Sequence, residues 1–202
     1  MDFWDGNSQA DWLLAEGHYW DLVKETDLER RMEALCSQEV KNMNTEEFFD
    51  FLFYEYFVWK YTAKNRLATA RKQLQKHRDT LSELKAIQKA LFSFDLNDSG
   101  QGLRTAMRIK GLGPAGASGL LAILFPQYFG TVDQFVVKSL AQFEFFAADL
   151  TLQKIKPDSI SEEDAVYLIE LLKRKARELN RIHHTDYWTP RRIDKVLWAW
   201  GR

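Results

Sequence analysis

Two glycines separated by a single residue, Gly111 and Gly113, lie between the stretches 103–109 and 115–125, which both have helical character. Glycine tolerates positive φ, so such a pair lets the chain reverse direction within very few residues. Pro114 suits the first turn of the second helix, where its missing N–H costs nothing. The sequence therefore predicts two helices joined by a very tight hairpin, and this feature restricts the fold more than any other.

The composition favours an all-α fold. Apolar residues make up 46% of the chain, enough for a substantial core, while only 10 of the 202 residues are glycine and 4 are proline. A β-sandwich or barrel would need more turn residues than this. No segment alternates convincingly between apolar and polar positions. We therefore expect a compact multi-helix bundle that contains the hairpin.

We expect two regions that pack together as one compact unit. Residues 1–100 should form an N-terminal helical region with an aromatic-rich core helix, and residues 101–202 should hold the hairpin and the C-terminal helices. The core helix is expected to open at Thr45 and to run without interruption to Lys76. Its first half, 48–59, is apolar almost all round, which is typical of a helix in the middle of a bundle.

Several classes of protein are disfavoured by the sequence. Cys36 is the single cysteine, so no intramolecular disulfide can form, and no apolar run reaches the length of about 18 residues that predicts a membrane span. The acidic N-terminus lacks the basic start of a signal peptide. A cytoplasmic location is the default expectation. The adjacent His183 and His184 do not have the spacing of converging metal ligands, and we expect no metal site.

Charge is distributed unevenly along the chain. The net charge is −1, but residues 1–60 hold 14 acidic and 5 basic residues, whereas residues 61–202 hold 15 acidic and 23 basic residues. Such asymmetry indicates an electropositive face. A helix opened by Ser161 carries a basic cluster that is either a solvated face or a surface for nucleic-acid phosphates, consisting of Lys173, Arg174, Lys175, Arg177 and Arg181.

The last helix also hints at an anion. Thr189 and Pro190 predict its start, as a cap followed by an N1 proline. Arg191 and Arg192 then fall in the first turn, where the helix dipole disfavours cations. This arrangement indicates that a phosphate or a carboxylate lies opposite these side chains.

The hairpin has the chemistry of a phosphate site. The first N–H groups of the helix that follows Gly113 have no partner within the helix, and they can bind an anion. The string 109–115, with the Ala-rich and Leu-rich helix after it, resembles the helix–hairpin–helix motif of DNA repair and replication proteins. That resemblance implies contacts to the backbone of duplex DNA, made by Lys110, Gly111, Leu112, Gly113 and Ala115, and an association with the nucleoid.

A second stretch extends the resemblance. Residues 126–138 contain a loop with proline and glycine and then Asp133, twenty residues after Gly113. This arrangement resembles the helix–hairpin–helix base-excision DNA glycosylases, and by that resemblance Asp133 is the catalytic carboxylate. Gln134 and Lys138 then fall among the DNA-binding residues. The structural alternative is that Asp133 only caps the helix that follows it.

One departure from that family concerns the nucleophile. Bifunctional members carry a lysine two residues after the second glycine, where this chain has Ala115. The resemblance therefore implies a monofunctional enzyme that hydrolyses the N-glycosidic bond of a damaged or modified base with water. The missing lysine also fits a descendant that binds DNA and has lost the chemistry. No four-cysteine cluster follows, so we expect no iron–sulfur centre and no other cofactor.

Aromatic residues in the N-terminal third allow two further interpretations. Tyr54, Tyr56, Trp59 and Tyr61 could stack on a flipped base, although most residues in such an apolar helix belong to the core. The region could also serve a helical protein-interaction protein that touches no nucleic acid. The sequence leaves three hypotheses: a glycosylase-like enzyme, a non-catalytic DNA-binding or DNA-structure-sensing module, and an interaction protein.

Overall fold

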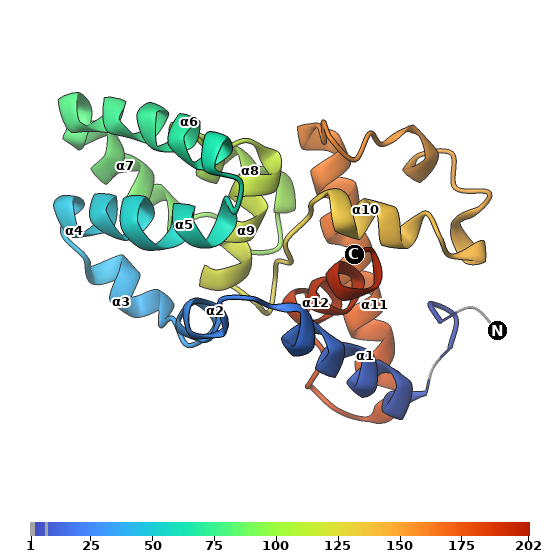
Figure 1. The fold of residues 1–202 in the computed structure, drawn as a ribbon. Helices are drawn as coiled ribbons and strands as arrows, with labels where there is room; N and C mark the ends of the chain where they lie inside the picture. Colours follow the sequence, from blue (N-terminus) through green and yellow to red (C-terminus); the bar gives the residue numbers. More distant parts are fainter. Residues whose placement is uncertain (1–2, 7) are drawn as a thin grey trace.

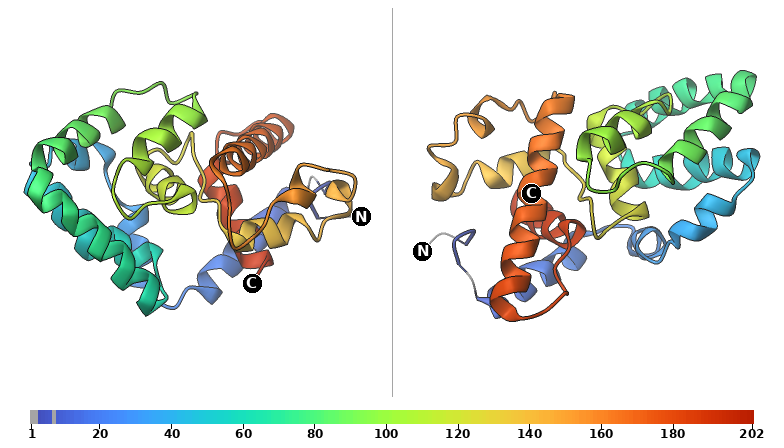
Figure 2. Two further views of the ribbon diagram at one scale, coloured as in Figure 1. Left: turned by 90° about the horizontal axis from the view of Figure 1, so that it is seen from above. Right: turned by 180° about the vertical axis from the view of Figure 1, so that it is seen from behind.

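The computed structural model describes residues 3–6 and 8–202, and within them the chain is helical, with no strand. This confirms the prediction of an all-α fold. The helices form two lobes (Figure 1). We call them the hairpin lobe, residues 26–124, and the terminal lobe, residues 8–22 and 133–200. The two views of Figure 2 show the same division.

The hairpin lobe holds the elements α2 to α9. They are α2 (Thr26–Glu33), α3 (Ser37–Asn42), α4 (Thr45–Asp50), the π-helix η1 (Phe51–Tyr56), α5 (Phe57–Lys60), α6 (Lys64–Leu74), the 3₁₀ helix η2 (Gln75–Thr80), α7 (Leu81–Leu91), α8 (Ser99–Met107) and α9 (Pro114–Leu124). The start of α4 is fixed by a capping box, in which the Asn44 side chain accepts from the Glu47 N–H and the Glu47 carboxylate accepts from the Asn44 N–H.

The prediction of an uninterrupted helix from Thr45 to Lys76 is wrong. The chain leaves the helix at Tyr61, which has φ −111° and ψ 88°, and α6 begins only at Lys64. The Tyr61 hydroxyl donates a hydrogen bond of 3.0 Å to the carbonyl of Gly111, fifty residues away. This tertiary contact accompanies a break that no glycine or proline marks in the sequence. The break separates the apolar half of the expected helix from its basic half.

The terminal lobe combines both ends of the chain. It contains α1 (Gln9–Leu22), α10 (Gln134–Leu140), the short 3₁₀ helices η3 (Glu144–Phe146) and η4 (Leu152–Lys154), α11 (Glu162–His183) and α12 (Pro190–Trp200). The predicted caps Ser161 and Thr189 are confirmed, since each side chain accepts from a first-turn N–H. Helix α1 packs against α12, so the packing does not follow the expected division at residue 100.

The lobes share one core and are in direct contact. A single cluster of buried apolar side chains runs from Trp12 in α1 through Phe57 and Leu120 to Leu197 in α12. Helix α11 contacts both α8 and α9, which places the hairpin helices at the junction of the lobes. None of the helices in the described part of the chain combines the length and the apolar character needed to cross a bilayer.

Candidate nucleic-acid interface and active site

The two glycines of the hairpin have different surroundings. Gly111 has φ +101°, a conformation that residues with a side chain rarely adopt. A Cβ at this position would lie 2.6 Å from the carbonyl oxygen of Ala70 and 3.1 Å from Cε2 of Phe57. Gly111 is therefore required by the fold, because it lets the hairpin pack directly on α6.

Gly113 is not required in the same way. Its φ of −93° is open to any residue, it caps the start of α9, and a Cβ would meet no atom within 4 Å. Within residues 3–6 and 8–202, the amides of Gly113 and Ala115 donate no hydrogen bond. The N-terminus of α9 thus presents unpaired N–H groups behind an exposed glycine, as a phosphate site requires.

Two tyrosines hold the hairpin from the side of α5. Tyr56 is fully buried and its hydroxyl donates to the carbonyl of Gly116, while Tyr61 bonds Gly111. Burial raises the pKa of Tyr61 to about 12, so its hydroxyl stays protonated and remains a donor. Tyr56 therefore belongs to the core. Tyr54 is 60% exposed on the surface.

Lys110 and Leu112 face the protein. The Lys110 ammonium lies 2.8 Å from the Glu83 carboxylate, and its backbone N–H donates to Nε2 of His77 at 3.0 Å. The side chain of Leu112 is buried. Burial and the charge of Lys110 lower the pKa of His77, which keeps the imidazole neutral and able to accept this hydrogen bond. Of the expected DNA-binding residues in the hairpin, Gly113 and Ala115 offer unpaired amides.

Asp133 caps α10, as the structural alternative predicts. Its Oδ1 accepts from the N–H groups of Phe135 at 2.9 Å and Val136 at 3.3 Å. The preceding residue is fixed to α9, because the N–H of Val132 donates to Oγ of Ser118 at 3.0 Å. The carboxylate of Asp133 is partly exposed and is held close to the middle of α9.

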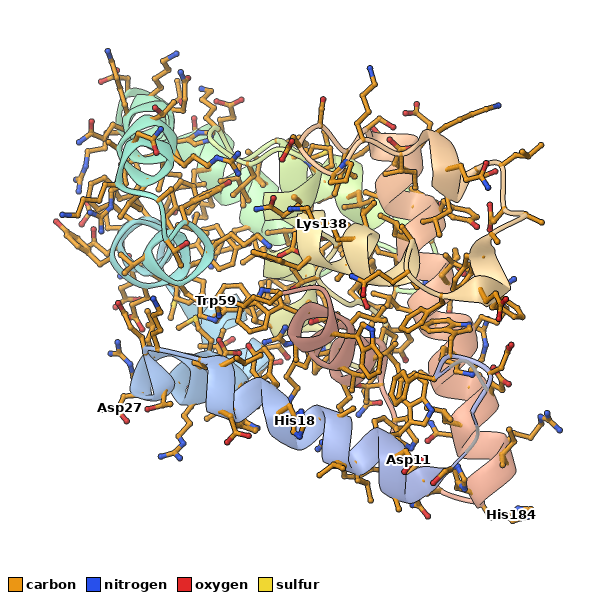
Figure 3. All side chains as sticks on the ribbon, turned by 45° about the vertical axis from the view of Figure 1, so that its right-hand side comes forward. Asp11, His18, Asp27, Trp59, Lys138 and His184 are labelled. Carbon is orange, nitrogen blue, oxygen red and sulfur yellow. The ribbon has the colours of Figure 1, made fainter. Side chains whose placement is uncertain are left out.

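Gln134 and Lys138 lie one turn apart on α10. Lys138 is exposed, and its ammonium is 3.3 Å from Oε1 of Gln134. Figure 3 labels Lys138 on α10 in the terminal lobe and Trp59 at the end of α5 in the hairpin lobe. The exposed ammonium and amide can reach a ligand without losing a buried ion pair.

A buried ionic network joins the two lobes, and the sequence did not reveal it. The Arg191 guanidinium lies 2.5 Å from Glu29 of α2 and 2.7 Å from Asp194. Trp59 donates from its indole N–H to the same Glu29 at 2.5 Å. The anion expected opposite Arg191 is therefore a pair of protein carboxylates.

Asp194 connects this network to the segment before Asp133. Its Oδ2 accepts from the N–H of Thr131 at 2.6 Å. Burial raises the pKa of Asp194 to about 7, against the opposing effect of Arg191. The network thus holds Thr131, two residues before Asp133, while Ser118 holds Val132.

Lys60 is a second residue that the sequence did not single out. It was one of several lysines and arginines in the basic part of the expected long helix. The structure instead places it at the end of α5, half-buried against α9. Burial lowers the pKa of Lys60, while the charges of Asp133 and Asp194 oppose this shift.

Only part of the basic cluster on α11 is exposed to solvent. Lys173 and Lys175 are buried: the ammonium of Lys173 lies 2.6 Å from Oγ of Ser99, and that of Lys175 lies over the rings of Trp4 and Trp12. Lys173 and Lys175 therefore belong neither to a solvated face nor to a surface for nucleic-acid phosphates, and both interpretations of the cluster are wrong for these two residues. Arg174, Arg177 and Arg181 remain exposed.

No group of three His, Cys, Asp or Glu side chains in the described ranges is arranged to hold a metal ion. In comparisons with known proteins, no protein-family model, no curated protein and no solved structure matches this chain.

Proposed function

We propose that this protein binds the phosphate backbone of duplex DNA through the N-terminus of α9 and acts as a monofunctional DNA glycosylase. The observation that carries the proposal is Gly113. It is a glycine that neither backbone geometry nor packing requires, and it lies in front of unpaired amides. A missing side chain at this point lets a phosphate approach the amides closely. Access for a phosphate therefore accounts for a glycine that the fold itself does not require.

The proposed chemistry uses Asp133. A carboxylate there would stabilise the positive charge that develops on the sugar as the glycosidic bond breaks, or would activate the attacking water. Its two hydrogen bonds from backbone N–H groups fix the position of the carboxylate at the start of α10. Ala115 supplies no amine, so water is the proposed nucleophile for base release.

Asp133→Asn tests this chemistry with little risk to the fold, because asparagine caps helices as well as aspartate does. Wild-type protein and the variant are incubated with a panel of duplexes that carry damaged or modified bases, and abasic products are revealed by alkali. We expect release from at least one duplex by the wild type and a loss of about 100-fold or more in the variant. Equal activity of the two proteins, or no release from any duplex, would refute catalysis by Asp133.

A non-catalytic DNA-binding module is the second candidate, and the capping role of Asp133 favours it, since capping alone explains that aspartate. This candidate predicts salt-dependent affinity for duplex DNA without base release. A mobility-shift series over salt concentration separates both DNA-binding candidates from a protein-interaction role. An interaction protein would not shift any duplex even at low salt.

A further inference from the structure

We propose that a groove between α6 and the hairpin is a second site for the DNA backbone, where a phosphate lies next to the one bound at the start of α9. The inference rests on the proposed DNA binding and extends it to α6 (Lys64–Leu74), a helix far from the stretches that resemble a known family. It does not depend on any chemistry at Asp133, because it concerns only the path of the strand.

The groove is a hollow in the surface with a volume of about 280 Å³. Ala70 and Gly111 line it at the point where the hairpin packs directly on α6. The rest of its lining is polar and consists of Tyr61, Asn65, Arg66, Thr69 and Gln73. Tyrosine, asparagine, arginine, threonine and glutamine all belong to the side chains that contact phosphate and sugar in protein–DNA complexes. The lining therefore has the chemistry of a site for a nucleic-acid backbone.

The side chains of α6 that line the groove have donors to spare. Among the described residues, the Arg66 guanidinium forms no ion pair and no hydrogen bond, and Asn65 uses only its side-chain oxygen, which accepts from the Arg66 N–H at 2.9 Å. The side chains of Thr69 and Gln73 likewise donate to no described residue. Asn65, Thr69 and Gln73 are spaced by four residues, so they follow one another along one face of the helix. A strand in the groove would meet this row of unused donors.

The charge of Arg66 acts on the side of α6 that faces the hairpin. Burial raises the pKa of Tyr61 and the charge of Arg66 opposes this effect, so the guanidinium lies near the hydroxyl that bonds Gly111. Gly111 is two residues before Gly113, and two residues of chain span about 7 Å at most. A single DNA strand rises about 3.4 Å per nucleotide. The groove and the start of α9 are therefore close enough to hold neighbouring phosphates of one strand.

The first turn of α6 lacks a negative charge to balance its cations. Lys64 and Arg66 lie where the helix dipole disfavours positive charge, and no acidic residue accompanies them. Helix α12 also begins with cations, but there the Glu29 carboxylate lies 2.5 Å from Arg191. In the part of the chain that the structure describes, no carboxylate lies within 4 Å of the ammonium of Lys64 or the guanidinium of Arg66. An anion from another molecule would supply the missing charge.

The charge of α6 as a whole favours DNA as this anion. The helix contains four basic residues and no acidic residue, although the chain has a net charge of −1. Duplex DNA carries one negative charge per about 1.7 Å of its axis, so it offers a continuous row of phosphates to such a helix. A solvated surface explains exposed cations, but it does not explain why the uncapped start of α6 has cations without carboxylates beside a groove that reaches the hairpin.

Asn65→Asp adds a negative charge to the groove and leaves the contacts within the protein in place. The new side chain keeps the oxygen that accepts from the Arg66 N–H, and an acidic residue in the first turn stabilises a helix. The midpoint of urea unfolding should therefore be no lower than that of the wild type.

Asn42→Asp is the matched control. Asn42 is exposed, and its side-chain oxygen accepts from Gln38 at 3.0 Å, so aspartate keeps this contact as well. It lies at the end of α3, which Figure 1 shows at the edge of the hairpin lobe away from α6. The two variants thus add the same charge to the same lobe, inside the groove and far from it.

Affinity for an undamaged duplex is measured by mobility shift over a series of salt concentrations, with Gly113→Asp included for the site on α9. We expect Asn65→Asp to raise the Kd by about 10-fold, as the loss of a charge-assisted contact does, and Asn42→Asp to leave it unchanged. Arg66→Gln removes one cation from the backbone, so the slope of log Kd against log salt should fall by about 0.9.

An unchanged Kd for Asn65→Asp, or equal losses of affinity in Asn65→Asp and Asn42→Asp, would overturn the proposal, as would an unchanged salt slope for Arg66→Gln. If Gly113→Asp weakens binding in the same series, the site on α9 stands and the groove alone is refuted. Weaker binding by Asn65→Asp with no effect of Gly113→Asp would instead support the groove and refute the phosphate site on α9.

Discussion

The two hairpin glycines should respond very differently to the same substitution. In Gly111→Ala the new residue must hold φ near +101°, and its Cβ must lie 2.6 Å from the Ala70 carbonyl oxygen unless the backbone moves. A side chain in this backbone region costs about 1–3 kcal/mol, and overpacking costs about 1–3 kcal/mol more. The reduced entropy of the unfolded chain offsets about 0.4–1 kcal/mol. The net expectation is a loss of about 1–5.5 kcal/mol in the free energy of unfolding.

Gly113→Ala adds the same methyl group where nothing lies within 4 Å and where φ is −93°. The entropy gain of about 0.4–1 kcal/mol is then opposed only by the poorer capping ability of alanine, which costs about the same. The unfolding free energy should therefore stay within about 0.5 kcal/mol of the wild type.

Urea unfolding followed by far-ultraviolet circular dichroism measures both effects on the same protein. With a slope of about 2 kcal/mol/M, Gly111→Ala should lower the midpoint by about 0.5–3 M, while Gly113→Ala should leave it almost unchanged. Equal shifts for the two variants would show that the assignment of one glycine to the fold and the other to a ligand is wrong.

Two further results are expected. His77 should make a contribution to the unfolding free energy that is lost as the pH falls below about 6.5, because its pKa is lowered from 6.5 in the folded chain and the unfolded chain takes up the proton first. The raised pKa of Asp194 acts in the opposite direction, so the His77 contribution is measured as the difference between the wild type and His77→Gln in parallel titrations; a difference that does not change with pH would contradict it. Arg191→Met should lose about 3–5 kcal/mol in urea unfolding, since it leaves the buried carboxylates of Glu29 and Asp194 without their partner; a loss below about 1 kcal/mol would contradict the network.

Features that depend on neighbouring residues could be predicted from the sequence. Ser161 and Thr189 cap their helices as expected because a cap needs only a short polar side chain and the next few N–H groups. The helices on both sides of Gly111 follow from local chemistry in the same way. The break at Tyr61 was missed because the hydrogen bond that accompanies it reaches a residue fifty positions away.

The residues of the candidate site could likewise be predicted only where they lie close together in the sequence. Asp133 could be selected because its spacing from Gly113 lies within one short stretch of chain. Lys60 and Glu29, the partner of Arg191 from α2, could not, because they meet α9 and α12 only when distant helices pack together. The basic residues on α11 illustrate the reverse error, since Lys173 and Lys175 belong to a charged stretch but are buried.

The proposal that the start of α9 binds a DNA phosphate is tested most directly by comparing the affinities of Gly113→Asp and Gly17→Asp for duplex DNA. Aspartate is a favoured cap and has open space at position 113, so the fold should keep its stability. The added carboxylate would nevertheless repel a phosphate at the start of α9. Gly17 is exposed in α1, also has open space around it, and provides the same charge change in the terminal lobe.

In mobility-shift titrations at fixed salt, we expect Gly113→Asp to raise the Kd by about 10-fold to 100-fold, equivalent to about 1.4–2.8 kcal/mol, while the Kd of Gly17→Asp stays close to that of the wild type. Equal affinities for all three proteins would contradict the claim that the start of α9 holds a DNA phosphate.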